Sequence, residues 1–272
     1  MDNDKQKQIL NKLVEALQII EGIEAIALGG SVARGIAKAD SDIDIGLYYH
    51  DTSPFSIDAV KVLAEQFNDT ATVADFGGWG KWVNGGAWLT IEGQRVDFLY
   101  RSIDTLQAWI TKSQAGEIEL DYYQQPATGF YSYIYLGELS ICKPLYQVNT
   151  VLDDLKEQVA NYPIKLKEKI IKDFTWQAAF SLIHAEKAMA RDDTFTFIGC
   201  LHRAASSIIQ LAYAYNEQYF ISDKGAVSEC SQFSLIPQYF AEHIEDIFFK
   251  PDTGSIHYLR EMIGYFSDRN YR

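Results

Sequence analysis

The chain has 272 residues, of which 47% are hydrophobic, enough to form a full core in one large or two ordinary domains. Its net charge of −13 argues against broad nucleic-acid binding, which needs Lys and Arg to replace counterions. Three scattered cysteines fit neither a disulfide framework nor a zinc site, so we expect a reducing, cytoplasmic setting. The polar N-terminus is unlike a secretory signal and no apolar run could cross a bilayer, so we expect no membrane partner.

The first hundred or so residues predict an alternation of helices and short strands, because apolar residues recur there with both helical and strand spacing. Helices are predicted over 5–21, 32–37, 53–67 and 102–113. Strands are predicted over 23–28, 43–49, 70–74, 87–91 and 95–100. The glycine-rich segment 77–86 is predicted as a loop from its composition.

Beyond residue 115 the pattern becomes helical. A Tyr- and Gln-rich segment, 117–150, contains a predicted helix over 131–141 that Lys143-Pro144 ends. Further helices are predicted over 152–191, 194–220, 236–248 and 254–267. We therefore expect an α/β (α+β) N-terminal domain with a small mixed sheet over 1–115, a junction over 116–150 and a helical bundle over 151–272.

The most informative pattern is a glycine turn with two aspartates downstream. The turn Gly29-Gly30-Ser31-Val32-Ala33-Arg34-Gly35 follows an apolar run, and Ser41-Asp42-Ile43-Asp44 opens the next predicted strand. Alternate side chains of a strand share a face, so Asp42 and Asp44 point the same way, about 6.5–7 Å apart. Two carboxylates beside a turn that presents backbone N–H groups form a place for a divalent metal and a polyphosphate.

The glycines alone do not decide between a ligand-binding turn and a tight turn without a ligand. The spacing lacks the G-x-G-x-x-G of dinucleotide-binding turns. Gly30 and Gly35 fit the two glycines of a P-loop, but Ile36-Ala37 stands where that motif requires Lys and then Ser or Thr.

A third carboxylate favours the metal-site interpretation. Like charges side by side on a strand cost stability unless a cation neutralises them. Asp97 lies in the otherwise apolar strand Val96-Asp97-Phe98-Leu99, where an unpaired charge is expensive. If this strand neighbours that of Asp42 and Asp44, three carboxylates converge, a ligand set that suits Mg²⁺ or Mn²⁺. The alternative for Asp97 is an acidic residue on an edge strand.

This arrangement resembles the DNA polymerase β-like nucleotidyltransferase superfamily. The glycine turn after Leu28, the Asp42-Ile43-Asp44 strand and the later Asp97 stand in the order of that superfamily's motifs. The layout, a small catalytic domain followed by a helical bundle, is similar to the small-molecule branch with kanamycin and lincosamide nucleotidyltransferases.

The resemblance implies roles for the matching residues. Gly29, Gly30 and Ser31 would hold a nucleoside triphosphate. Asp42 and Asp44 would bind two Mg²⁺ ions, with Mn²⁺ as an alternative, and Asp97 would complete the second metal site and help to take a proton. Arg34 would stabilise phosphate charge, or it is a solvated arginine at the start of a helix.

The expected reaction moves AMP from ATP to a hydroxyl group of a small molecule and releases pyrophosphate. One alternative is a protein-modifying adenylyltransferase, and another is a non-catalytic nucleotide-binding or antitoxin-like module. The acidic composition disfavours RNA as the acceptor. The Trp79, Trp82 and Trp88 region is either a flap over the ligand or part of the domain core, and we favour the core.

Overall fold

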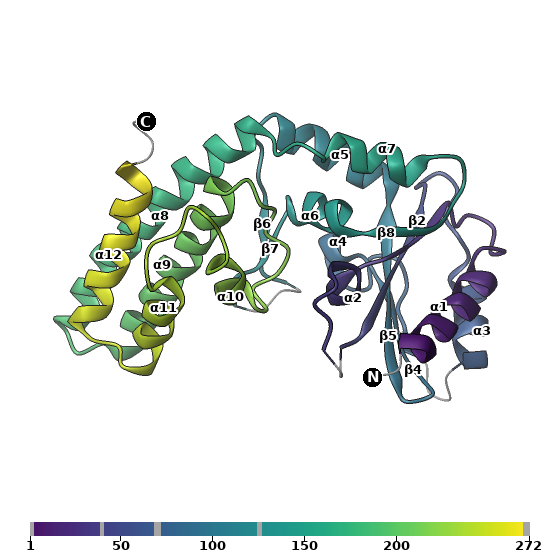
Figure 1. Ribbon diagram of the computed structural model, residues 1–272, viewed down its shortest axis with the longest axis horizontal. Coiled ribbons are helices and arrows are strands. Elements are labelled where there is room, and N and C mark those ends of the chain that lie inside the picture. Colours follow the sequence, from purple (N-terminus) through teal and green to yellow (C-terminus); the bar gives the residue numbers. More distant parts are fainter. Residues whose placement is uncertain (1–2, 39–40, 68–71, 124–126, 269–272) are drawn as a thin grey trace. The chain divides into compact units, whose positions relative to one another are not determined.

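The computed structural model describes residues 3–38, 41–67, 72–123 and 127–268 (Figure 1). The chain divides into two compact units. The first, the sheet unit, comprises residues 1–112 and 119–161, and the second, the helical unit, comprises 113–118 and 162–272. Residues 119–150, placed in the junction by the sequence-based division, lie in the sheet unit.

The sheet unit is built on a six-stranded mixed sheet, which confirms the predicted fold class. Its strands lie in the order β3-β4-β5-β2-β1-β8, and every neighbouring pair is antiparallel except β2 and β5, which are parallel. The strands are β1 (Ala25–Leu28), β2 (Ile43–Tyr49), β3 (Thr72–Val73), β4 (Gly86–Ile91), β5 (Gln94–Ser102) and β8 (Lys143–Gln147).

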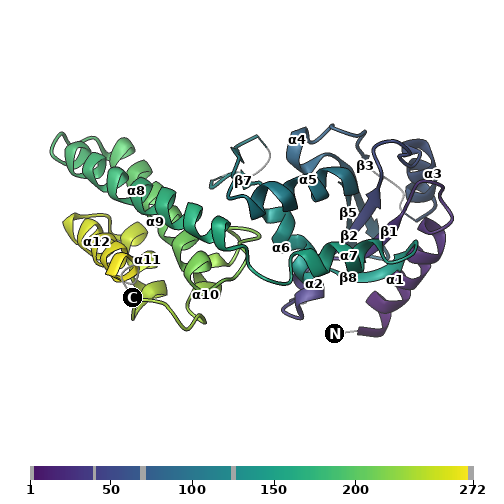
Figure 2. The ribbon, with the colours of Figure 1, turned by 90° about the horizontal axis from the view of Figure 1, so that it is seen from above.

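Helices cover the sheet because every second side chain of its strands is apolar. The helices of the sheet unit are α1 (Asn3–Leu17), α2 (Gly30–Arg34), α3 (Ile57–Phe67), α4 (Gly80–Val83), α5 (Ile103–Gln114), α6 (Ile134–Ile141) and α7 (Val151–Gln158). A small hairpin adds β6 (Leu120–Asp121) and β7 (Phe130–Tyr131). Leu13 of α1, Val60 of α3 and Phe98 of β5 belong to one buried cluster on the face that α1 and α3 cover (Figure 2).

The helical unit consists of α8 (Ile164–Met189), α9 (Thr194–Tyr215), α10 (Ala226–Cys230), α11 (Phe240–Phe249) and α12 (Thr253–Ser267). Side-chain caps begin two of these helices: Asp193 accepts from the Thr196 N–H in α9, and Asp252 forms a capping box with Ser255 in α12. Within the described part of the chain, no helix is both long and apolar enough to cross a membrane.

Several parts of the predicted secondary structure are wrong, and β6, β7 and α10 are elements that the sequence did not predict. The predicted loop 77–86 contains the helix α4, and the predicted helix 152–191 is interrupted before Ile164, where Pro163 has extended backbone. The strand β8 follows α6 directly and was not predicted. The sequence-based prediction used Pro144 only as the end of a helix. Proline is tolerated in β8 because β8 is an edge strand. Residues 70–71 of the predicted strand 70–74 lie outside the described residues.

A buried ion pair fastens α4 and α6 to the other face of the sheet. Arg101 of β5 is 5% exposed, and its Nε and Nη2 lie 2.8 Å and 2.9 Å from the two carboxylate oxygens of Glu138 on α6. Its Nη1 donates to the carbonyl of Val83 at the end of α4, at 3.1 Å. The bidentate geometry satisfies the guanidinium, so a single side chain ties together three elements.

The substitution Glu138→Ala therefore leaves a charge buried without its partner. We expect it to lower the free energy of unfolding by about 3 kcal/mol, measured by urea unfolding followed by tryptophan fluorescence. The exposed pair Lys12–Glu92, at 3.6 Å, supplies the control: Lys12→Ala should cost less than about 1 kcal/mol. Equal costs for the two variants would contradict the structural role of the Arg101–Glu138 pair.

Candidate active site

The parallel pairing of β2 with β5 brings the second and third predicted carboxylates together. Asp44 and Asp97 are direct partners in the strand register, so their side chains lie on one face of the sheet. Neighbouring strands are about 4.8 Å apart. Asp42 lies two residues before Asp44 and shares its face by strand alternation. The condition on which the predicted carboxylate site depended, that the two strands are neighbours, is met.

The glycine turn lies directly against Asp44. The Gly29 N–H donates to the Asp44 carbonyl at 2.8 Å. Gly30 has φ 57°, and a Cβ atom there would lie 1.8 Å from Oδ2 of Asp44. Gly30 thus serves two needs, a left-handed backbone and room for a carboxylate against bare main chain.

Ser31 and Arg34 lie on the short helix α2 that follows the turn. Ser31 is in its first turn and Arg34 in its last, and both are partly buried. Gly29, which has no side chain to cap the helix, is the N-cap residue of α2. Phosphate binding by these residues stays a prediction.

Arg95 is a site residue that the sequence-based prediction missed. Its Nε lies 2.6 Å from Oδ1 of Asp42. The available signal was its position two residues before Asp97 on the same strand, which places both side chains on one face. Arg95 provides local positive charge beside the carboxylates.

The surroundings of Asp97 disfavour its ionised form. Partial burial raises its pKa, the negative charge of Asp42 raises it further, and Arg95 acts in the opposite direction. A cation placed beside Asp97 would relieve both unfavourable effects.

A pocket of about 380 Å³ opens on this face of the sheet. Two of the predicted carboxylates line it, together with residues of β3, β4 and β5; the lining residues are Asp42, Thr72, Trp88, Leu89, Thr90, Arg95 and Asp97. Trp88 is 55% exposed and is the direct register partner of Asp97 across β4 and β5. The volume is within the usual range for small-molecule sites.

The predicted core role of the tryptophans fits Trp82 but not Trp88. Trp82 is buried and packs against Trp109 and Phe130. Trp88 instead stacks on Trp79, with ring centroids 4.7 Å apart, and faces the pocket beside Asp97.

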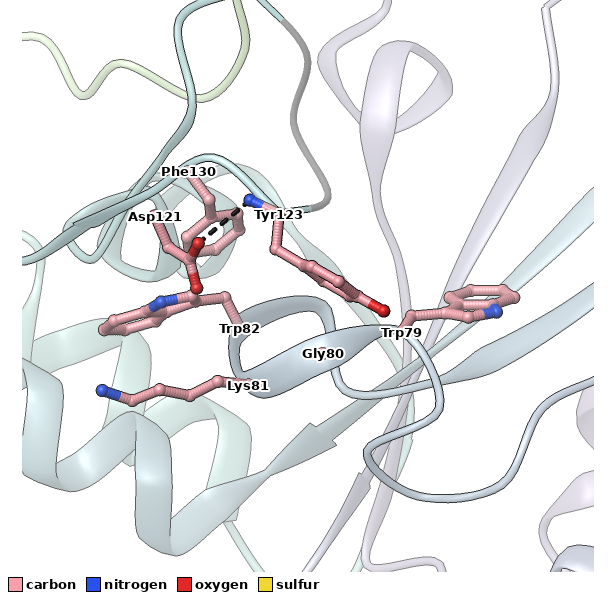
Figure 3. Close-up of a pocket in the computed structure, with 7 residues that line it drawn as sticks. All are labelled: Trp79, Gly80, Lys81, Trp82, Asp121, Tyr123 and Phe130. Carbon is pink, nitrogen blue, oxygen red and sulfur yellow. Dashed lines mark hydrogen bonds between the residues drawn. The ribbon is translucent and has the colours of Figure 1, made fainter.

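A second pocket lies beside α4, between Trp79, Trp82, Tyr123 and Phe130 (Figure 3). Its volume of about 10 Å³ leaves room for about one water molecule, so it is not a ligand site. Lys81, which lies on α4 beside this pocket, has its Nζ 2.6 Å from a carboxylate oxygen of Glu119. Its charge is therefore already paired.

The chemistry of the three aspartates fits a magnesium ion, which prefers oxygen ligands. No group of three or more His, Cys, Asp or Glu side chains is arranged to hold a metal ion, among the residues that the structure describes. Asp42 contacts Arg95, and Asp44 lies against Gly30. The three carboxylates therefore lie on one face of the sheet but do not converge on one point. The donor types and the raised pKa of Asp97 are what support a cation here.

Comparison with known proteins identifies the domain that holds this site. Residues 8–107 match the family model described as a nucleotidyltransferase domain, and this segment includes the glycine turn and all three aspartates. Residues 8–107 therefore form a nucleotidyltransferase domain, which supports nucleotidyl transfer as the activity.

A crystal structure of a nucleotidyltransferase-like protein from Exiguobacterium sibiricum 255-15 is similar at 11% sequence identity and a TM-score of 0.45, over 97% of this chain and 73% of that one. No curated protein matches the chain.

Substitution of Gly30 by Ala tests its contact with Asp44. Gly35, with φ 73° and open space around it, is the matched control for backbone strain alone. We expect Gly35→Ala to cost about 1 kcal/mol of unfolding free energy, and Gly30→Ala to cost at least about 1 kcal/mol more because of the steric clash. In an Asp44→Ala background the difference between the two costs should shrink, because only the contact with the Cβ atom of residue 44 at 3.2 Å remains, as measured by urea unfolding. A difference of undiminished size would contradict the contact.

The raised pKa of Asp97 determines how the stability of the fold changes with pH. A carboxyl whose pKa is higher in the folded state favours folding below its unfolded pKa and loses that contribution as pH rises through its folded pKa. Asp97→Asn removes this dependence. Without added metal, we expect the variant to gain stability relative to the unsubstituted protein between pH 4 and pH 7, measured by thermal unfolding. A relative loss of stability by the variant over that pH range would contradict a raised pKa of Asp97 in the folded state.

Proposed function

We propose that this nucleotidyltransferase moves AMP from ATP to a hydroxyl group of a small molecule and releases pyrophosphate. The observation that carries the proposal is the register of β2 and β5, which sets Asp44 beside Asp97 next to the glycine turn. Such a face can hold a triphosphate and its metal together.

The glycine turn and α2 supply the donor side. Backbone N–H groups of Gly29 to Ser31 and the Ser31 hydroxyl would bind the triphosphate oxygens. The Arg34 guanidinium would add positive charge from the same short helix.

Asp42, Asp44 and Asp97 would hold Mg²⁺, with Mn²⁺ as an alternative. When bound, the metal neutralises phosphate charge and lowers the pKa of the acceptor hydroxyl. Asp97 would accept the hydroxyl proton at a carboxylate oxygen, which its raised pKa favours. The acceptor oxygen bonds to the α-phosphorus, the bond from that phosphorus to the oxygen bridging to the β-phosphate breaks, and pyrophosphate leaves.

A small molecule is the acceptor class that the composition favours. A net charge of −13 would repel the phosphates of a nucleic acid. The pocket of about 380 Å³ beside Asp97 is of a size for a small compound. A cytoplasmic location is part of the proposal, and the absence of a cysteine framework fits a reducing compartment.

The test is transfer of label from α-³²P-ATP in the presence of Mg²⁺ to a panel of sugars, polyols, nucleosides and hydroxylated aromatic compounds, with pyrophosphate release as a second readout. We expect Asp44→Asn to lower the transfer rate by at least about a hundredfold, because it removes a metal-binding charge. Chelation of the metal should have the same effect.

Asp58→Asn is the control, since Asp58 lies on α3 with its side chain 91% exposed. It should leave transfer unchanged. Full transfer by Asp44→Asn would contradict the proposed site, and label found on protein would replace the small-molecule acceptor with a protein acceptor. Failure to bind Mg²⁺-ATP at all would favour a non-catalytic module.

A further inference from the structure

The groups of the site lie in a fixed order across the sheet. The glycine turn contacts Asp44 on β2, Asp97 follows on β5, and Trp88 follows on β4, each strand pair in direct register. Since neighbouring strands are about 4.8 Å apart, Trp88 stands roughly 10 Å from the Asp44 strand, on the side away from the glycine turn.

This order would place the entering acceptor and the leaving pyrophosphate on opposite sides of the α-phosphorus. The inference rests on the proposed function, in which the glycine turn holds the triphosphate. An in-line displacement at the α-phosphorus requires the entering oxygen to approach opposite the leaving pyrophosphate. The leaving group lies toward the glycine turn, so the acceptor enters from the side of β5 and β4, where Trp88 lines the pocket.

The chain holds the Trp88 ring in place by a second indole. Trp79 stacks on Trp88 with ring centroids 4.7 Å apart and 23° between the ring planes, and the backbone N–H of Trp79 donates to the Asn84 carbonyl at 2.8 Å. A Cβ atom at Gly86 would lie 2.6 Å from the Trp79 ring and 1.9 Å from the Phe98 carbonyl oxygen. The strand thus carries a glycine where the Trp79 ring crosses it. Figure 3 shows this ring pointing away from Trp82.

The exposed indole is accompanied by hydroxyl groups. Thr90 lies two residues after Trp88 on the same strand face, and Thr72 lines the same pocket from β3. A flat apolar surface beside hydroxyls suits a compound that has a ring and several polar substituents. We infer that the Trp79–Trp88 pair is the acceptor-side packing surface and selects hydroxyl compounds that carry a ring.

The test measures donor and acceptor binding separately in Trp88→Ala, Trp88→Phe and Trp176→Ala. Trp176 is the control because it is 62% exposed on α8, in the helical unit. The donor probe is α,β-methylene-ATP with Mg²⁺, followed by calorimetry. The acceptor probes are phenol and methyl β-D-glucopyranoside, which have rings, and glycerol, which has none, titrated by saturation-transfer NMR with and without the donor probe.

We expect Trp88→Ala to weaken binding of the ring probes by about tenfold, and Trp88→Phe to restore it to within about twofold. Trp176→Ala should change nothing, glycerol should show no dependence on Trp88, and donor affinity should stay within about twofold throughout. Equal ring-probe binding in Trp88→Ala, no ring-probe binding to the unsubstituted protein, or loss of donor affinity in Trp88→Ala would each overturn the inference. Absence of donor binding by the unsubstituted protein would instead count against the proposed function, while the titrations without donor still report on Trp88.

Discussion

The candidate site depends on one pairing, the parallel alignment of β2 with β5. This alignment places Asp44 directly beside Asp97, with Asp42 on the same face. Burial raises the pKa of Asp97, and the negative charge of Asp42 raises it further. The sheet therefore carries an electrostatic cost at this position, which the proposed Mg²⁺ ion would reduce.

The surrounding elements keep that arrangement in place. Gly30 allows the carboxylate of Asp44 to rest against the main chain, where any side chain would collide with it. Arg95 offsets part of the negative charge by contacting Asp42. Farther along β5, Arg101 binds Glu138 and the end of α4. The polar face of the sheet is thus divided between an open, acidic end and a closed end fixed by a buried ion pair.

Local patterns predicted the parts of the site that depend on local structure. The predicted strand 43–49 and the predicted helix 102–113 are confirmed, because strand alternation and helix capping act over a few residues; Ser102 accepts from the Thr105 N–H at the start of α5. The strand β8 could not be predicted in this way, since its pairing with β1 joins segments more than a hundred residues apart and proline obscures it. The contact of Arg95 with Asp42 likewise depends on which strands become neighbours. Trp82 is buried and Trp88 is exposed to the pocket. This difference depends on which distant segments pack over each ring, and local sequence patterns do not show that.

The proposed function requires one face of the sheet to hold both the triphosphate and its metal. The most direct test is a crystal structure with α,β-methylene-ATP and Mg²⁺. We expect triphosphate oxygens on the N–H groups of Gly29 to Ser31, and a metal coordinated by Asp42, Asp44 and Asp97. A nucleotide bound elsewhere, or a metal that contacts none of these aspartates, would contradict the proposed function.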